Sequence, residues 1–272
     1  MSLTSYQTAP PREIILYALK YILLKTSLLV LFIFMTINLS IIIPTYKENK
    51  NIKNLIKLIY KKINLNSKRF EIIIVDDNSK DGIESTCNEL KKKFTNLRLL
   101  VRKKVTKDLS QSCIKGFNAS KYSNILVMDA DLQHHPKYIN KMLNEYIRYD
   151  LDVLVACRKF GDRSKVGVNY LRYKLSKFII FVFNFFLGFK TNDPMSGFFI
   201  FKKEIFYVNK NRLFGKGYKI LADLIYNSKY DLKISDIYID FHKRLFNSSK
   251  MSFKILILIS FFFVRNFFHK RS

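Results

Sequence analysis

The sequence predicts an α/β fold in which helices flank both faces of a mostly parallel central sheet. Two observations lead to this prediction. Short apolar runs alternate with amphipathic segments from residue 39 onward, and acidic turns follow several of the runs. Apolar strands that alternate with helices are typical of sheets buried on both faces. At 272 residues, the chain is long enough for one large domain or two small ones.

The expected elements follow one another in a regular order. Strands are predicted at residues 39–43, 71–75, 97–101, 124–128 and 152–156. Helices are predicted between them, at 50–63, 83–94, 109–120 and 136–149. After residue 158 the pattern changes to a polar loop at 158–167 and a basic, aromatic helix at 171–189. That helix fits a membrane interface and a buried core equally well.

Apolar segments at both ends of the chain predict association with a membrane. Residues 14–37 are long enough to cross a bilayer, but Lys20 and Lys25 make spanning costly unless they snorkel. We expect an uncleaved membrane-associated helix there, with spanning as the alternative. The run at 253–268 is too short to span comfortably and is expected to lie in the interface. The expected divisions are 1–38, 39–252 and 253–272.

The net charge of +27, from 48 Lys and Arg against 21 Asp and Glu, has three competing explanations. Nucleic acid, an anionic membrane surface and phosphate-bearing substrates all attract such a chain. The excess is spread along the whole chain, and no zinc-finger spacing, basic-region heptad or aromatic RNA-binding signature accompanies it. The charge alone therefore does not decide the partner.

Carboxylates follow three of the predicted strands. Glu48 follows the first strand, Asp76 and Asp77 the second, and Asp129 and Asp131 the strand at 124–128. Because the carboxyl ends of parallel strands meet at one edge of a sheet, we expect five carboxylates to converge. Oxygen ligands of this kind favour Mg²⁺ or Mn²⁺ over zinc. The alternative is that each pair is ordinary turn chemistry, since Asp and Asn commonly follow strands.

The three cysteines, Cys87, Cys113 and Cys157, are isolated and odd in number. They form no CxxC pair and no disulfide framework, which suits a reducing compartment. We expect them to be small buried apolar residues rather than nucleophiles.

Four motifs resemble a known family. They are Pro44-x-Tyr46-x-Glu48, Val75-Asp76-Asp77-x-Ser79, Met128–Pro136 (Met-Asp-Ala-Asp-Leu-Gln-His-His-Pro) and Asp193-Pro194-x-Ser196-Gly197-Phe198. Together they are similar to the dolichol-phosphate mannose synthases of glycosyltransferase family two, over roughly residues 39–252. The resemblance implies a GT-A fold for this region, with an acceptor loop and interfacial helix at 158–189.

The resemblance also implies a role for individual residues. Nucleotide-sugar binding is implied for Pro44, Tyr46, Glu48, Asp76, Asp77, Asp129 and Ala130. A metal, Mg²⁺ or Mn²⁺, is implied at Asp129, Asp131 and Gln133. Acceptor-phosphate binding is implied for Arg158, Arg172, Ser176 and Ser249, and a part in catalysis for Asp131, Arg244 and Lys250. Asp223 stands where relatives carry an acidic residue. The adjacent His134 and His135 have no further His or Cys cluster to support a zinc site.

The implied reaction is inverting transfer of mannose from GDP-mannose to dolichyl phosphate, for glycosylation and GPI-anchor pathways. It implies the cytosolic face of the endoplasmic reticulum membrane, small membrane-anchoring subunits as possible partners, and no nucleic acid. One alternative is a UDP-glucose-dependent polyprenyl-phosphate glucosyltransferase, and another is a basic membrane-tethered binding protein. A processive polysaccharide synthase would need a Gln-x-x-Arg-Trp motif, and the chain has no Trp.

The chain departs from the family at two loop glycines, where it has Asp108 and Asn247. With only 8 glycines in the chain, Asn and Asp are expected to serve where a turn needs a positive φ. If the family's glycines adopt a positive φ, these two replacements are the least costly ones.

Overall fold

The computed structural model describes residues 37–103, 106–158, 181, 185, 188–217 and 220–240. Its described strands form one seven-stranded sheet in the order β3-β2-β1-β4-β6-β5-β7. The strands are β1 (Leu39–Thr45), β2 (Phe70–Asp76), β3 (Leu97–Val101), β4 (Asn124–Met128), β5 (Val153–Arg158), β6 (Phe198–Lys202) and β7 (Ile234–Ile239). Strand β6 runs antiparallel to both of its neighbours, and the other pairings are parallel. The sheet is therefore mixed and mostly parallel, as the sequence predicts.

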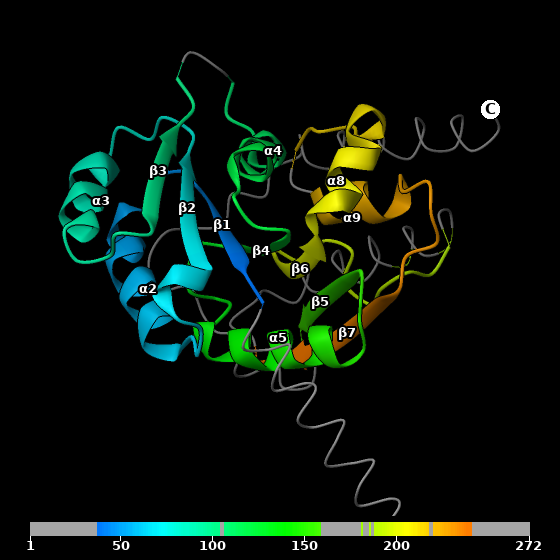
Figure 1. The fold of residues 1–272 in the computed structure, drawn as a ribbon. Coiled ribbons are helices and arrows are strands. Elements are labelled where there is room, and N and C mark those ends of the chain that lie inside the picture. The colour runs from blue at the N-terminus through cyan, green and yellow to red at the C-terminus, as the bar shows by residue number, and fades with distance from the viewer. Residues whose placement is uncertain are drawn as a thin grey trace, which may run out of the picture. The chain divides into compact units, whose positions relative to one another are not determined.

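Helices cover both faces of this sheet (Figure 1). The helices α2 (Asn49–Lys62), α3 (Ile83–Lys91) and α5 (Ile139–Arg148) lie on one side. The helices α4 (Leu109–Ala119), α8 (Lys203–Asn209) and α9 (Ile220–Tyr226) lie on the other. Three short 3-10 turns complete the described elements: η1 (Ser67–Arg69), η2 (Pro136–Tyr138) and η3 (Lys210–Arg212). The first five strands and the four helices between them fall where the sequence predicts them, whereas β6, β7, α8 and α9 were not predicted.

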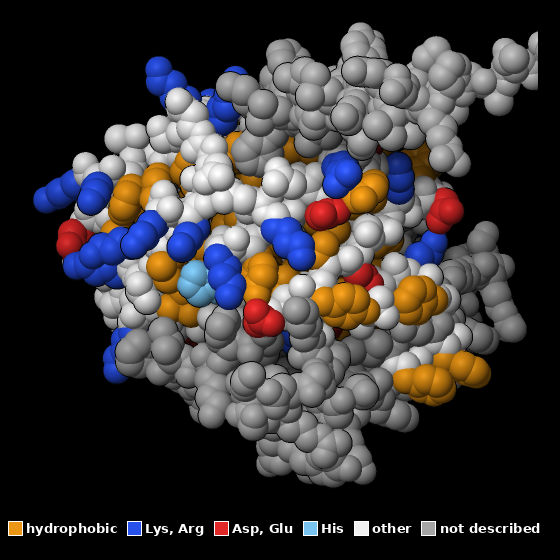
Figure 2. Space-filling view, turned by 90° about the horizontal axis from the view of Figure 1, so that it is seen from below, with side chains coloured by type: hydrophobic (Ala, Val, Ile, Leu, Met, Phe, Trp, Pro, Cys, Tyr) orange, Lys and Arg blue, Asp and Glu red, His pale blue; other side chains and the backbone are white. Residues whose placement is uncertain are grey.

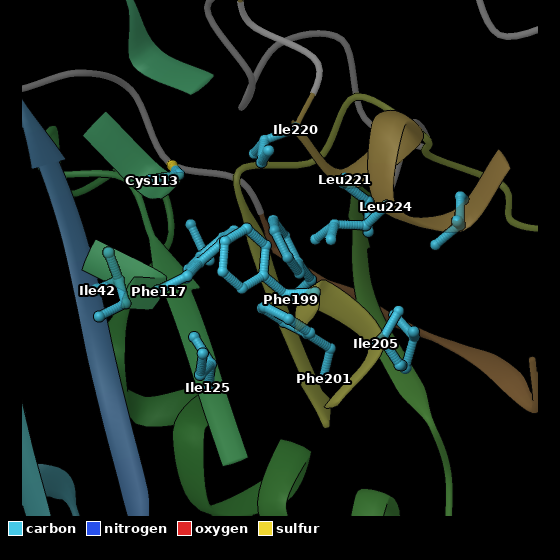
Figure 3. Close-up of a cluster of buried hydrophobic side chains, with 14 of the residues drawn as sticks. Ile42, Cys113, Phe117, Ile125, Phe199, Phe201, Ile205, Ile220, Leu221 and Leu224 are labelled. Atoms are coloured by element: carbon cyan, nitrogen blue, oxygen red, sulfur yellow. The ribbon is translucent and has the colours of Figure 1, made fainter. Parts of the chain in front are cut away.

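The core between the sheet and α4, α8 and α9 is rich in aromatic side chains (Figure 3). Phe117 of α4 packs edge-on against Phe201 of β6 and Phe206 of α8, with ring centroids 5.0 and 5.3 Å apart. Helix α4 lies close to the sheet because Gly116 has no side chain, and a Cβ there would overlap with Ile42 of β1. This packing fixes the position of α4, whose first turn lines the pocket described below.

The opposite face of the sheet is covered by amphipathic helices. Helix α2 buries Ile52, Leu55, Ile56 and Ile59, while Lys53, Lys57 and Lys61 on its other side are exposed. Lys and Arg side chains spread over this side of the surface with few carboxylates among them (Figure 2). Part of the large positive charge is therefore simply the solvated face of these helices.

The terminal segments predicted to meet a membrane are 14–37 and 253–268. All of 253–268, all of 14–37 except Ile37, and most of 171–189 lie outside the described residues. Within the described part of the chain, no helix combines the length and the apolar character needed to cross a bilayer.

The three cysteines are free and buried in the fold. This confirms the prediction that they serve as small apolar residues. Burial raises the pKa of the Cys87 thiol to about 11, so the thiol is protonated at neutral pH.

Candidate active site

A pocket lies where β1, β2 and β4 end and α4 begins. Its lining residues are Pro44, Thr45, Tyr46, Glu48, Asp77, Lys107, Leu109, Ser112, Asp129, Ala130 and Asp131. The parallel pairing of β1 with both β2 and β4 brings the three strand ends together, since Thr45 lies opposite Asp76 and Ile42 opposite Val127. Seven of the eleven lining residues are ones that the resemblance assigned to donor or metal binding. Four carboxylates line this one pocket.

Asp77 is held in place by three donors. Its carboxylate pairs with Arg102, accepts a hydrogen bond from the Ser112 hydroxyl, and accepts the backbone N–H of Asp108 at 2.6 Å. Asp77 and Arg102 are both buried, so their pairing compensates for the loss of water around each charge. The Asp77 carboxylate therefore has a fixed orientation at the wall of the pocket.

Asp76 is bonded to its own neighbourhood, and its predicted contact with the nucleotide-sugar stays a prediction. It is buried, and its carboxylate accepts hydrogen bonds from the Thr45 hydroxyl at 3.0 Å and from the Ser79 backbone N–H at 2.7 Å. Asp76 is not among the residues that line the pocket. It closes the turn after β2. Successive side chains leaving a strand point in opposite directions, so Asp76 and Asp77 face opposite ways. Of the two adjacent aspartates, only Asp77 faces the pocket.

The turn after β4 carries Asp129 and Asp131. Asp131 is buried, and its Oδ1 accepts the backbone N–H of Gln133 at 3.1 Å. Leu132, directly after Asp131, has a φ of 62°, a conformation that non-glycine residues rarely adopt. The Gln133 side chain is not part of the pocket lining, and its proposed contact with a metal stays a prediction. The strained turn aims Asp129 and Asp131 into the pocket together.

Positive φ angles gather in the loops around the pocket. Lys47 after β1, Asn78 and Lys80 after β2, and Leu132 after β4 all have φ between 52° and 62°. The expectation that Asn and Asp would serve at such positions is met by Asn78, and by Asp150 elsewhere in the fold, but not by the two lysines or Leu132. Backbone strain of this kind costs energy and persists where the surrounding structure enforces it, often at functional sites.

The carboxylate oxygens of the pocket are suitable ligands for a hard divalent cation. Asp129 and Asp131 offer carboxylate oxygens, and the Nδ1 atom of buried His134 lies 3.7 Å from Asp129 Oδ2. Within the described ranges, no three His, Cys, Asp or Glu side chains form a ready-made metal site. Mg²⁺ is typically bound through one or two carboxylates plus substrate phosphates, so two aspartates beside an open pocket are sufficient.

The segment from Asp193 to Gly197 packs against Asp129. The Asp193 carboxylate receives two hydrogen bonds from the Arg158 guanidinium, at 2.7 and 3.0 Å. The Ser196 hydroxyl donates to the Ala156 carbonyl at 2.7 Å. A Cβ atom on Gly197 would overlap with the Asp129 carboxylate. Arg158 is thus part of the support for this segment, and its predicted contact with an acceptor phosphate stays a prediction.

Of the two positions at which the chain departs from the family, Asp108 is within the described residues. Asp108 does not take a positive φ; its φ is −160°, and its side chain caps α4 by accepting the Gln111 backbone N–H at 3.0 Å. Asn247 lies outside the described residues, as do Arg172, Ser176, Arg244, Ser249 and Lys250. Asp223 is buried in α9 and accepts the backbone N–H groups of Phe214 and Gly215, at 2.8 and 2.6 Å.

The structure adds four lining residues that were not predicted: Thr45, Lys107, Leu109 and Ser112. Lys107 is the only basic side chain among the described residues that line the pocket, and its Nζ lies 4.0 Å from the centre of the Tyr46 ring. The only signal in the sequence was the position of Lys107 just before a predicted helix. The contact of Lys107 with the Tyr46 ring depends on the packing of α4 against the sheet.

Comparison with known proteins agrees with this architecture. Residues 40–208 match glycosyl transferase family 2. The chain is 32% identical over 219 residues to the dolichol-phosphate mannosyltransferase of Pyrococcus furiosus, covering 80% of this chain and 60% of that protein. It is 31% identical over 226 residues to the dolichol-phosphate mannosyltransferase of Mycosarcoma maydis, covering 80% of this chain and 74% of that protein.

Among solved structures, the fold is similar to that of glucosyl-3-phosphoglycerate synthase from Mycobacterium tuberculosis, in complex with Mn²⁺, UDP-glucose and phosphoglyceric acid. The TM-score is 0.61 at 15% identity, covering 85% of this chain and 78% of the other. At this identity the likeness concerns the fold, which is of the GT-A type.

Proposed function

The chain belongs to glycosyltransferase family 2, and from this membership we propose that it transfers mannose from GDP-mannose to dolichyl phosphate. Relatives that carry this activity in their names align with about four-fifths of the chain, although the chain spans only 60% of the Pyrococcus protein. The observation that carries the proposal is the convergence of Glu48, Asp77, Asp129 and Asp131 on one pocket.

Carboxylates that crowd together favour a cationic partner, and a nucleotide-sugar supplies a diphosphate that such a cation binds. Asp129 and Asp131 would hold Mg²⁺ or Mn²⁺, with Gln133 as a further predicted ligand. When bound, the ion neutralises the charge that develops on the departing nucleoside diphosphate. Lys107, which also lines the pocket, adds a positive charge from the protein itself.

The nucleoside end of the donor is assigned to Asp77 and Tyr46. The Asp77 carboxylate is fixed by Arg102 and Ser112, so it offers hydrogen-bond acceptors in one defined direction. The Tyr46 ring offers an aromatic surface beside Lys107. Because these groups are fixed before the donor arrives, the donor loses less binding energy to ordering of the protein.

The acceptor explains why the site needs no general base. A phosphate monoester has a second pKa of about 6, so it is largely ionised at neutral pH. An oxygen of the lipid phosphate attacks the anomeric carbon as the bond from that carbon to the donor diphosphate breaks, in a single step that inverts the configuration. The protein contributes alignment and charge stabilisation. The residues proposed for the acceptor phosphate are Arg158, Arg172, Ser176 and Ser249, and those proposed to assist the step are Arg244 and Lys250.

A lipid acceptor requires a position at a membrane surface. The proposal therefore includes the cytosolic face of the endoplasmic reticulum membrane, contact through the apolar terminal segments, and small membrane subunits as partners. Dolichyl phosphate mannose made there would serve glycosylation and GPI-anchor assembly.

The principal rival keeps the fold and changes the donor to UDP-glucose. A second rival, of a different class, is a basic membrane-tethered binding protein, which accounts for the charge of +27 but gives no reason for four carboxylates in one pocket.

A transfer assay tests the proposal. Purified chain in detergent is offered GDP-mannose or UDP-glucose with dolichyl phosphate, with and without Mn²⁺. Metal-dependent transfer from GDP-mannose that Asp131→Ala abolishes is the expected result, and Asp231→Ala, at an exposed carboxylate outside the pocket, serves as the matched control. Transfer from UDP-glucose alone would replace the donor, and retention of anomeric configuration would contradict the mechanism. Full activity of Asp131→Ala would contradict the assigned site.

A further inference from the structure

Asp108 lies between two pocket residues without lining the pocket itself. Its neighbours in sequence, Lys107 and Leu109, both line the pocket, and its own backbone N–H donates to the Asp77 carboxylate at 2.6 Å. Its carbonyl accepts a hydrogen bond from Arg102, the partner of Asp77, at 3.0 Å. The backbone of Asp108 is therefore built into the wall that carries Asp77.

The side chain of Asp108 accepts two further hydrogen bonds. One oxygen caps α4 through the Gln111 backbone N–H, at 3.0 Å. The other accepts the backbone N–H of Gly217 at 2.7 Å, although that residue lies 109 positions further along the chain. Asp108 thus joins the wall of the pocket to the loop formed by residues 213–217.

This loop is held along its length by the same region and by α9. The Ser110 hydroxyl donates to the Gly217 carbonyl at 2.9 Å, and the Gln111 amide donates to the Gly215 carbonyl at 2.6 Å. From the other side, Asp223 accepts two N–H groups of the loop. Gly215 and Gly217 both have positive φ, at 64° and 86°, so the loop follows a path that most residues do not adopt.

We propose that Asp108 is a positioning residue that couples the donor pocket to the loop 213–217. Order in the loop stabilises the orientation of Asp77 and Lys107, and an occupied pocket stabilises the loop in return, because energetic coupling between two sites is reciprocal. The proposal depends on the proposed function in one respect, which is that the pocket binds a nucleoside diphosphate.

Two substitutions separate the bonds of Asp108. Asp108→Asn keeps one acceptor oxygen and loses the second, so it cannot serve both Gln111 and Gly217. Ser110→Ala removes a bond to Gly217 without touching Asp77 or its partners. Asn66→Ala is the matched control, since Asn66 also caps a short helix, by accepting the Lys68 N–H at 2.9 Å, and lies outside the pocket lining.

The measurements are GDP binding by calorimetry with Mn²⁺ present, and amide hydrogen exchange of residues 213–217 with and without GDP. In the wild type, GDP is expected to slow exchange of the loop. In Asp108→Asn the Kd for GDP is expected to rise about tenfold, equal to about 1.4 kcal/mol. GDP should then no longer protect the loop, and kcat at saturating donor should change by less than about threefold. Ser110→Ala should show the same effects in smaller measure, and Asn66→Ala should show none.

Three outcomes decide the matter. GDP binding and loop protection that Asp108→Asn leaves intact would overturn the coupling while leaving the proposed function standing. An equal effect of Asn66→Ala would mean that loss of any helix cap acts through stability, which would also overturn it. A wild type that is folded and does not bind GDP would overturn both proposals.

Discussion

Gly197 lies directly against the carboxylate of Asp129, and no side chain larger than hydrogen fits between them. The contact depends on the antiparallel pairing of β6 with β4, in which Phe198 lies opposite Met128. Because Met128 and Phe198 immediately flank these two residues, the pairing brings the glycine onto the aspartate. The Asp129 carboxylate can therefore occupy this position only because residue 197 has no side chain.

Gly197→Ala is expected to displace the Asp129 carboxylate and lower kcat/KM by about 100-fold, since a misplacement of about 1 Å at a reacting centre can cost that much. The measurement is steady-state transfer over a Mn²⁺ titration, together with the melting temperature. Leu143→Phe is the control, because Leu143 is fully buried in α5 and lies outside the pocket lining, so the larger ring overpacks the core rather than the pocket. That variant should lose stability and keep the kcat of its folded fraction. Equal activity losses in the two variants would show that overpacking alone is responsible.

Lys107→Gln is expected to raise the KM for the nucleotide-sugar about tenfold, with little change in kcat, because a hydrogen bond to a charged group contributes about 1.5–3 kcal/mol. Added salt should weaken donor binding in the wild type and have less effect in the variant. Lys103→Gln, an exposed lysine outside the pocket lining, is the control. An unchanged KM in Lys107→Gln would remove Lys107 from the donor site.

Arg158→Lys is expected to lower the free energy of unfolding by about 2 kcal/mol, because lysine cannot reproduce the two-point contact of arginine with Asp193. Chemical denaturation of the purified chain measures this change. The KM for dolichyl phosphate, measured on the same sample, tests the additional role in acceptor binding. A stability equal to that of the wild type would mean that the pair with Asp193 contributes nothing to the fold.

The native thiols are expected to resist modification at pH 8. Cys87 is buried, and burial raises its pKa to about 11. Its folded pKa is higher than its unfolded pKa, so this group favours the folded state less as the pH rises above the ordinary thiol value of about 8.5 towards 11. Thiol titration before and after denaturation is the measurement. Rapid reaction of any cysteine in the folded protein would contradict the expectation.

The first five strands and their helices were predictable because their signals are local. In β1, the apolar run from Leu39 to Ile43 and the amphipathic helix that follows are visible in any short window of sequence. The order of strands after residue 158 was not predictable in the same way. Strand β6 inserts between β4 and β5 and reverses direction, and such a pairing between distant segments leaves no periodic mark in either one.

The sequence by itself determined that carboxylates would gather at the carboxyl ends of β1, β2 and β4, because a residue's place at the end of a strand is a local property. Only the tertiary structure decided which carboxylates face the pocket. Asp76 turns away because Thr45 and Ser79 satisfy it, and Asp77 turns in because Arg102 and Ser112 hold it there. Apart from Ser79, these partners come from distant segments of the chain, so the choice between two adjacent aspartates was made by packing.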